Sequence, residues 1–196
     1  MKFVLSLCLV LSCLTILSLN PDSLSEENPS AIDSGRLHIL NRLAADCRGE
    51  NPQKCLHYAE EACKLATELS DNPALLTALG NLAGGYYLLG AEEEALHYYL
   101  QALELAEQLQ DSSAQAGICR EMGSIHATGK RYEEALNCYL RSLEIGERLG
   151  DKTGIAASVS SIGLIYLQLD DLDLAEQYLQ RSLQISEAEG EKYEIA

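Results

Sequence analysis

The residues Leu79-Gly80-Asn81-Leu82-Ala83-Gly84-Gly85-Tyr86 contain the pattern that decides how the whole chain folds. Leu79, Leu82, Ala83 and Tyr86 follow one another at intervals of 3, 1 and 3, which places them on one face of an α-helix. The same spacing returns 40 and then 80 residues later, in Cys119, Met122, Gly123 and His126 and in Val159, Ile162, Gly163 and Tyr166. Recurrence at a fixed period of this length predicts a solenoid of helical repeats.

A second helix is predicted after each of these segments, with an apolar face that small residues interrupt. Its aligned positions are Ala95, Tyr99, Ala102 and Leu103, then Ala135, Tyr139, Ser142 and Leu143, then Ala175, Leu179, Ser182 and Leu183. Two columns contain only alanine or glycine, namely Ala83/Gly123/Gly163 and Ala95/Ala135/Ala175. Small side chains let two crossing helices approach closely. The sequence therefore predicts an all-α stack of helical hairpins.

The joints between repeats keep the same period of 40. They are Leu69-Ser70-Asp71, Leu109-Gln110-Asp111 and Leu149-Gly150-Asp151, with Ala188-Glu189-Gly190-Glu191 where a fourth joint falls. Asn72 followed by Pro73 is expected to begin a helix, with Asn72 as its cap. Within the hairpins, turns are expected at Gly90, Gly129 and Asp170-Asp171. The predicted repeats cover about 34–72, 73–112, 113–152 and 153–190, and residues 191–196 match the start of a further, truncated repeat.

Leu79, Leu82, Ala83 and Tyr86, followed by Ala95, Tyr99 and Ala102, resemble the pattern of the tetratricopeptide repeat (TPR) family. The resemblance covers residues 34–190, and the 40-residue period resembles the longer variety of a repeat that most often has 34 residues. It implies a right-handed superhelical solenoid of stacked antiparallel helix hairpins. The first repeat aligns only if one residue is dropped from its turn, as befits a terminal unit with one solvated side.

The resemblance also implies a function, because the first helices of TPR hairpins line a concave groove that takes a partner's extended peptide or helix. The groove positions here would be Thr77, Gly80, Asn81, Gly84 and Tyr87, then Gly117, Arg120, Glu121, Ser124 and Ala127, then Ala157, Ser160, Ser161, Leu164 and Leu167. Asn81 is expected to bond a peptide backbone, Tyr87 to make apolar contact and Arg120 to pair with an acidic group. The predicted partner-binding residues are Asn81, Tyr87, Arg120, Ser124, Leu164 and Leu167.

Charge narrows the class of partner. Acidic residues outnumber basic ones 30 to 14, and no basic cluster is present to replace the counterions of nucleic acid phosphates. The partner is therefore expected to be a protein or peptide. The family variety that clamps a chaperone's C-terminal carboxylate uses Lys, Arg and Asn in its groove, and only Arg120 and Asn81 are available here, which argues against that role.

The first 20 residues are expected to direct the chain out of the cytoplasm. Phe3 to Leu19 carry no charge and follow Lys2, as in a secretory signal. A helix of this stretch spans about 25 Å, less than the roughly 30 Å of a bilayer core, yet a retained membrane anchor remains an alternative, as does lipidation at Cys13. The protein is thus expected to be periplasmic, extracellular or anchored through its N-terminus, and residues 21–33 are expected to form a flexible linker.

The cysteines and histidines are the candidate residues for disulfide formation or metal binding. Cys55, Cys63 and Cys119 occupy inward columns and are expected to be small core residues. Cys47 and Cys55 flank the first turn, so a disulfide between them in an oxidising compartment is an alternative that the sequence leaves open. His57 and His97 lack a second ligand at metal-binding spacing, and His126 replaces a tyrosine of its column. No catalytic set, metal site or cofactor site is expected.

Two interpretations of the whole chain remain open. In the first it is an exported interaction scaffold. In the second, residues 1–196 are the sensory region of a larger membrane signalling protein whose output part, a histidine kinase or a transcription regulator, lies beyond residue 196. A later span of about 20 apolar residues followed by such motifs would select the second.

Overall fold

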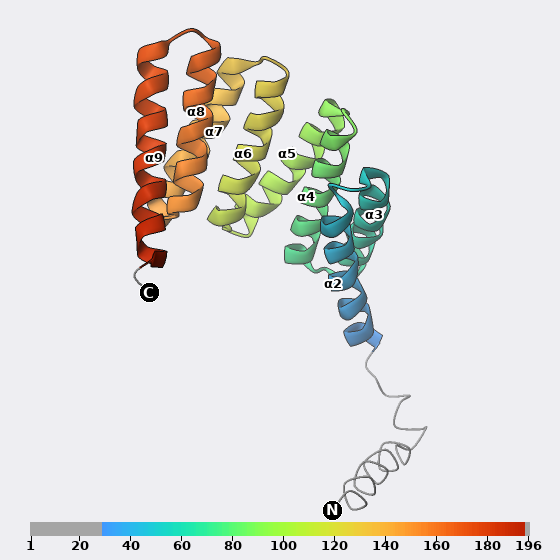
Figure 1. The fold of residues 1–196 in the computed structure, drawn as a ribbon. Coiled ribbons are helices and arrows are strands. Elements are labelled where there is room, and N and C mark those ends of the chain that lie inside the picture. The colour runs from blue at the N-terminus through green and yellow to red at the C-terminus, as the bar shows by residue number, and fades with distance from the viewer. Residues whose placement is uncertain (1–28, 195–196) are drawn as a thin grey trace, which may run out of the picture.

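The computed structural model describes residues 29–194, and within them the chain forms eight α-helices and no strand (Figure 1). Consecutive helices pair into four antiparallel hairpins that stack in chain order, so the predicted all-α solenoid is confirmed. The hairpins are α2 (Pro29–Cys47) with α3 (Pro52–Leu69), α4 (Asn72–Leu88) with α5 (Glu92–Gln108), α6 (Ser112–Thr128) with α7 (Tyr132–Leu149), and α8 (Lys152–Gln168) with α9 (Leu172–Glu194).

The joints between hairpins explain why the chain turns every 40 residues. The residue before each joint aspartate has a left-handed backbone, with φ of 57° at Ser70, 56° at Gln110 and 69° at Gly150, which ends the preceding helix. The following aspartate caps the next helix, as Asp71 Oδ1 does by accepting from the Ala74 amide at 3.0 Å. The prediction of Asn72 as the cap was wrong by one residue. The side chain of Asp71 accepts from the Ala74 amide, and Asn72 is already the first residue of α4.

The turns inside hairpins 2, 3 and 4 also use one left-handed residue each. These residues are Gly90, Lys130 and Asp170, spaced at the repeat period. The predicted turn at Gly129 is confirmed, because Gly129 is the C-cap of α6, and the left-handed residue of this turn is the next one, Lys130. The first hairpin has a four-residue turn, 48–51, where the others have three, which accounts for the residue that had to be dropped in the alignment.

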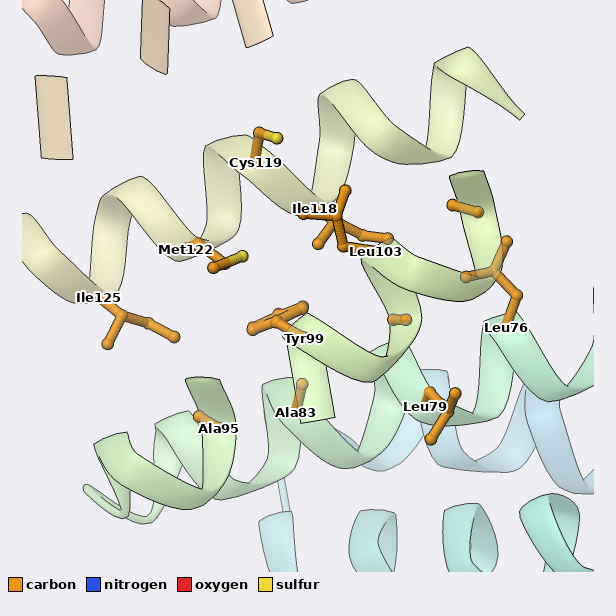
Figure 2. Packing of buried hydrophobic residues seen from close by; sticks show 12 residues of the cluster. Leu76, Leu79, Ala83, Ala95, Tyr99, Leu103, Ile118, Cys119, Met122 and Ile125 are labelled. Carbon is orange, nitrogen blue, oxygen red and sulfur yellow. The ribbon is translucent and has the colours of Figure 1, made fainter. Parts of the chain in front are cut away.

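The small-residue columns lie where helices nest. An added Cβ at Gly123 would lie 2.7 Å from Cε1 of Tyr139, and one at Gly163 would lie 2.9 Å from Cγ of Leu179. Ala83, on the same column, is fully buried beside Tyr99 in the central apolar cluster (Figure 2). Close packing of this kind tolerates no extra methyl group without movement of the neighbours.

The first helix of each hairpin lies on the inner side of the curved stack. α2 contacts α4 and α6 contacts α8, whereas no comparable contact joins one second helix to the next within residues 29–194. Elements on the inner side of a curve lie closer together than those outside. α4 and α6 are the exception, because they barely touch each other and hairpins 2 and 3 meet mainly through α5 and α6.

Both ends of the described chain differ from the sequence-based expectation. α2 begins at Pro29, so residues 29–33 of the predicted flexible linker are helical, with proline at a helix start as its fixed φ favours. α9 continues to Glu194 through the joint expected at residues 188–191. Glu191 stands where the other joints have aspartate, and the longer glutamate side chain is a poor cap, so the helix has no local signal to stop. The predicted leader, residues 1–20, lies outside the described residues.

Candidate functional site

Charge is distributed very unevenly between the inner helices of hairpins 2 to 4 and the outer helix α5. The inner helix α4 contains no charged residue, α8 contains only Lys152, and α6 contains Arg120 and Glu121. The outer helix α5 alone contains Glu92, Glu93, Glu94, Glu104 and Glu107. A helix that faces only water normally carries charges on its solvated side. The inner surface, formed by α4, α6 and α8, is therefore chemically suited to contact another molecule.

A cleft of about 670 Å³ opens between α4 and α6 on this inner surface. It exists because those two helices barely touch, and its floor is Tyr99 of α5. Leu76, Leu109 and Ile118 supply apolar lining, while the polar groups are Arg48, Asn81, Tyr99 and Glu121 among others. A mostly apolar concavity with a few polar groups is the usual form of a binding site, and its size falls within the common range of about 300–1,000 Å³.

Arg48 reaches the cleft from the long turn of the first hairpin. Its side chain crosses α4 at Gly84, where an added Cβ would lie 2.8 Å from Arg48 Cδ and 2.9 Å from Nη1. Glycine leaves this path open, whereas a Cβ at position 84 would require the Arg48 side chain to shift. Gly84 thus allows a cation from hairpin 1 to enter a cleft between hairpins 2 and 3.

Tyr99 and Asn81 are the buried polar groups of the cleft. Tyr99 is 3% exposed, and burial, helped by the carboxylate of Glu121 and opposed by Arg48, raises the pKa of its hydroxyl well above the ordinary value. The hydroxyl therefore stays protonated and can donate. Asn81 is 6% exposed, and its Nδ2 donates to the backbone oxygen of Asn41 at 3.1 Å. That bond orients the Asn81 amide and ties α4 to α2.

The predicted contact residues are spread along the inner surface. Asn81 lies in the cleft wall, whereas Arg120 does not line the cleft; it is half-buried on α6, at the position that Gly80 has on α4. Tyr87 is half-buried, and its hydroxyl hydrogen-bonds Thr128 Oγ1 at 2.9 Å. Thr128 donates to the Ser124 carbonyl at 2.9 Å, so Tyr87 is the donor in its own bond. This link joins α4 to α6 at the far end from the cleft's apolar lining.

Ser124, Leu164 and Leu167 extend the surface toward the fourth hairpin. The hydroxyls of Ser124 and Ser161 lie close to that of Tyr139; burial raises the pKa of Tyr139, and these two contacts oppose the rise. Leu164 is 51% exposed on α8, and Leu167 is exposed one turn further along. Both leucines are thus solvent-exposed on a helix whose one charged residue is Lys152, and their role in partner contact stays a prediction.

Sequence reasoning missed two residues of the cleft, Arg48 and Tyr99. Tyr99 was assigned to the packing between helices, and its ring does pack there, but its hydroxyl reaches through to the inner side. Arg48 could not be identified from helix periodicity, because it lies in the turn of hairpin 1 while its side chain lines a cleft formed by hairpins 2 and 3. The sequence signal that pointed to this contact was Gly84. It is a second glycine next to Gly85 inside a predicted helix, where glycine is normally unfavourable.

The cysteines are thiols in the described chain. Cys55 is fully buried, its Sγ donates to the backbone oxygen of Asn81 at 3.4 Å, and burial raises its pKa. Cys119 is also buried, and Cys63 is half-buried. A buried thiol with a raised pKa reacts slowly. The disulfide between Cys47 and Cys55 stays a prediction, tested by counting free thiols in denatured, exported protein.

A polar cluster of His126, Arg131 and Glu92 connects the turns of hairpins 2 and 3. Arg131 Nε donates to His126 Nδ1 at 3.0 Å, and Arg131 Nη2 pairs with Glu92 Oε2 at 3.1 Å. Burial, followed by the charge of Arg131, lowers the pKa of His126 below its usual 6.5, although Glu134 and Glu92 oppose this. Protonation would also replace an acceptor by a donor facing Arg131.

We expect stability to fall as this histidine is protonated. Because the folded-state pKa lies below the unfolded value, the contribution of His126 is present above about pH 6.5 and is lost as the pH falls through the folded pKa. Between pH 7.5 and 5.0, the wild type should lose up to about 1 kcal/mol more unfolding free energy than His126→Asn, whose amide oxygen accepts from Arg131 without titrating. Urea unfolding at each pH measures the difference, and identical slopes for both proteins would contradict the assignment.

Along residues 29–194, no helix has the length and apolarity needed to cross a bilayer.

Comparison with known proteins supports the repeat assignment. A family model described as tetratricopeptide repeat matches residues 36–108 and 116–188, together more than half of the chain. A search of curated proteins finds no match.

Among solved structures, BtubC (BKLC) from P. vanneervenii is 24% identical with a TM-score of 0.72, over 79% of this chain and 64% of that one. A Rap protein complexed with competence and sporulation factor is 20% identical with a TM-score of 0.72, over 78% and 43% of the two chains. A signal transduction ATPase with a tetratricopeptide repeat sensor, PH0952 from Pyrococcus horikoshii, is 21% identical with a TM-score of 0.69, over 76% and 23%. The chain thus spans between 23% and 64% of the length of these three proteins, and at such identities the likeness concerns the fold.

Proposed function

The chain belongs to the tetratricopeptide repeat family, and we propose that it is an interaction scaffold that holds a peptide or helix of a partner protein on its inner surface. The observation that carries the proposal is the inner surface itself. The three successive first helices α4, α6 and α8 contain only Lys152, Arg120 and Glu121 as charged residues, and they have an open cleft and the exposed leucines Leu164 and Leu167, whereas the outer helix α5 alone contains five glutamates. The Rap protein, which has this fold, was solved with a bound factor, which supports a binding role.

The partner-binding residues we propose are those predicted from the sequence, together with two from the structure. Asn81, Tyr87, Arg120, Ser124, Leu164 and Leu167 lie on the inner helices, and Arg48 and Tyr99 reach the cleft from elsewhere. Exposed apolar side chains supply the area that a partner buries, at about 25 cal/mol per Å². The buried polar groups of the cleft fix the partner's orientation.

We also propose that the scaffold works outside the cytoplasm or at a membrane surface, on the basis of the charge-free stretch from Phe3 to Leu19. The alternative is the sensory region of a larger signalling protein. It is favoured by one observation, the similarity to a signal transduction ATPase whose repeats are described as a sensor. Both alternatives place a partner or ligand on the same inner surface.

Site-specific photo-crosslinking tests the proposal with matched positions. A photoreactive phenylalanine at Leu164, which is 51% exposed on the inner helix α8, is compared with one at Leu100, which is 54% exposed on the outer helix α5. In cells of the source organism, we expect a discrete adduct from position 164 and none from position 100. Adducts from position 100 alone, or equal patterns from both positions, would contradict an inner-surface site.

A further inference from the structure

Three charged side chains line the cleft between α4 and α6, and two of them, Arg48 and Glu121, lack ion-pair partners within the described chain. The third, Asp111, caps α6 by accepting from the Ala114 amide at 2.9 Å. Arg131, Arg141 and Arg181 each pair with a glutamate from a neighbouring hairpin. Arg48 and Glu121, in contrast, make no ion pair with any residue of the described chain, although both line the cleft and both influence the hydroxyl of Tyr99. The cleft therefore presents a cation near α4 and an anion on α6.

The lining of the same cleft also contains an amide acceptor. The Asn81 amide is more than nine-tenths buried, and its Nδ2 is committed to the Asn41 backbone, which leaves its Oδ1 as an acceptor without a donor among residues 29–194. Tyr99, whose hydroxyl is protonated, lines the same cleft and adds a donor. Donors and acceptors side by side complement a peptide backbone, whose amide groups offer one of each.

We propose that the cleft binds a peptide segment carrying one acidic and one basic side chain, with its carboxylate at Arg48, its cation at Glu121 and a backbone amide at Asn81 Oδ1. This inference rests on the proposed function and specifies the chemistry of the partner. A peptide lying across the cleft removes water from both walls, and a charge that loses its water without gaining a partner weakens binding. A peptide with only acidic side chains would leave Glu121 without a cation, and a peptide with only basic side chains would leave Arg48 without an anion. The segment also places an apolar side chain against Leu76, Leu109 and Ile118.

A double-mutant cycle with defined peptides tests this. The probe is an N-acetylated, C-amidated pentapeptide of alanine, glutamate, leucine, lysine and alanine, in that order, compared with versions in which glutamine replaces the glutamate or the lysine. The proteins are the wild type, Arg48→Gln and Glu121→Gln, with Arg148→Gln and Glu104→Gln as exposed controls on the outer helices. Dissociation constants come from amide chemical shifts in the full chain at low salt.

The expected result is a specific pattern of coupling. On the wild type, each glutamine peptide should bind about three- to tenfold more weakly than the parent. Arg48→Gln should abolish the penalty for losing the glutamate and keep that for losing the lysine, and Glu121→Gln should do the reverse. The control variants should behave as wild type.

Contrary outcomes are separable. If the three peptides bind the inner helices equally well, or if the penalties are unchanged in both cleft variants, the charge assignment is overturned while the inner-surface function stands. If the peptides shift only resonances of α5 and α7, or none, both proposals fail. Free glycine binding as tightly as the pentapeptide would show a small-zwitterion site and overturn the assignment to a peptide.

Discussion

Tyr99→Ala is expected to lower the free energy of unfolding by about 3–5 kcal/mol, the usual cost of truncating a large buried aromatic side chain. Tyr99 is fully enclosed between α4, α5 and α6, with Ala83 and Ala95 on one side and Met122 on the other (Figure 2). The ring belongs to the apolar cluster that spans α4, α5 and α6 and so joins hairpins 2 and 3. Urea unfolding followed by circular dichroism at 222 nm, the helix band, gives the value.

Tyr99→Phe separates the ring from its hydroxyl. The phenylalanine ring keeps the packing, so this variant should lose no more than about 1.5 kcal/mol, the net value of one hydrogen bond. It should also weaken any ligand that uses the hydroxyl in the cleft. A loss as large as that of Tyr99→Ala would show that the hydroxyl, rather than ring packing, holds the junction.

Gly123→Ala is expected to destabilise the protein by about 1–3 kcal/mol, although alanine is the better helix former by about 1 kcal/mol. The new methyl group would meet the ring of Tyr139 at 2.7–3.0 Å, a distance that real contacts do not adopt. A rigid ring cannot yield as a flexible side chain would, so α6 and α7 must move apart.

Gly117→Ala is the matched control on the same helix. Nothing lies within 4 Å of a Cβ added at Gly117, so the same substitution should stabilise α6 by up to about 1 kcal/mol. The two variants should therefore differ by about 2–4 kcal/mol in unfolding free energy, with opposite signs relative to wild type. Equal effects would mean that the small-residue column has no packing role at position 123.

The architecture could be predicted from the sequence because its causes are local and repeated. The spacing of Leu79, Leu82, Ala83 and Tyr86 reports one helix face, and its recurrence identifies the stack. The errors were a single-residue one at a cap, at Asn72, and two at the ends of the described chain, where residues 29–33 and 188–191 are helical. At the cap, either Asp71 or Asn72 could accept from a free amide at the start of α4. Which one does so depends on the hydrogen bond from the Ala74 amide to Asp71, which the sequence does not show.

The cleft could be predicted only in part. Asn81 lies on a helix face, and its groove position followed from periodicity. The opening itself depends on how far α4 stands from α6, which is a tertiary property of bulky and small residues at one interface. Arg48 reaches the cleft because its turn has an extra residue and because Gly84 leaves room for its side chain. A single sequence does not show that these two features lie next to each other in the fold.

The most direct test of the inner-surface site is the affinity of the crosslinked partner for two doubly substituted proteins. Leu164→Glu with Leu167→Glu places two charges on the inner helix α8, and Leu100→Glu with Leu140→Glu places two on the outer helices, at leucines that are also exposed. Titration calorimetry should show at least about a tenfold loss for the inner pair, since each buried leucine is worth roughly 1.5–3 kcal/mol, and an unchanged dissociation constant for the outer pair. Loss of binding with the outer pair alone, or equal losses with both, would contradict a partner site on the inner surface.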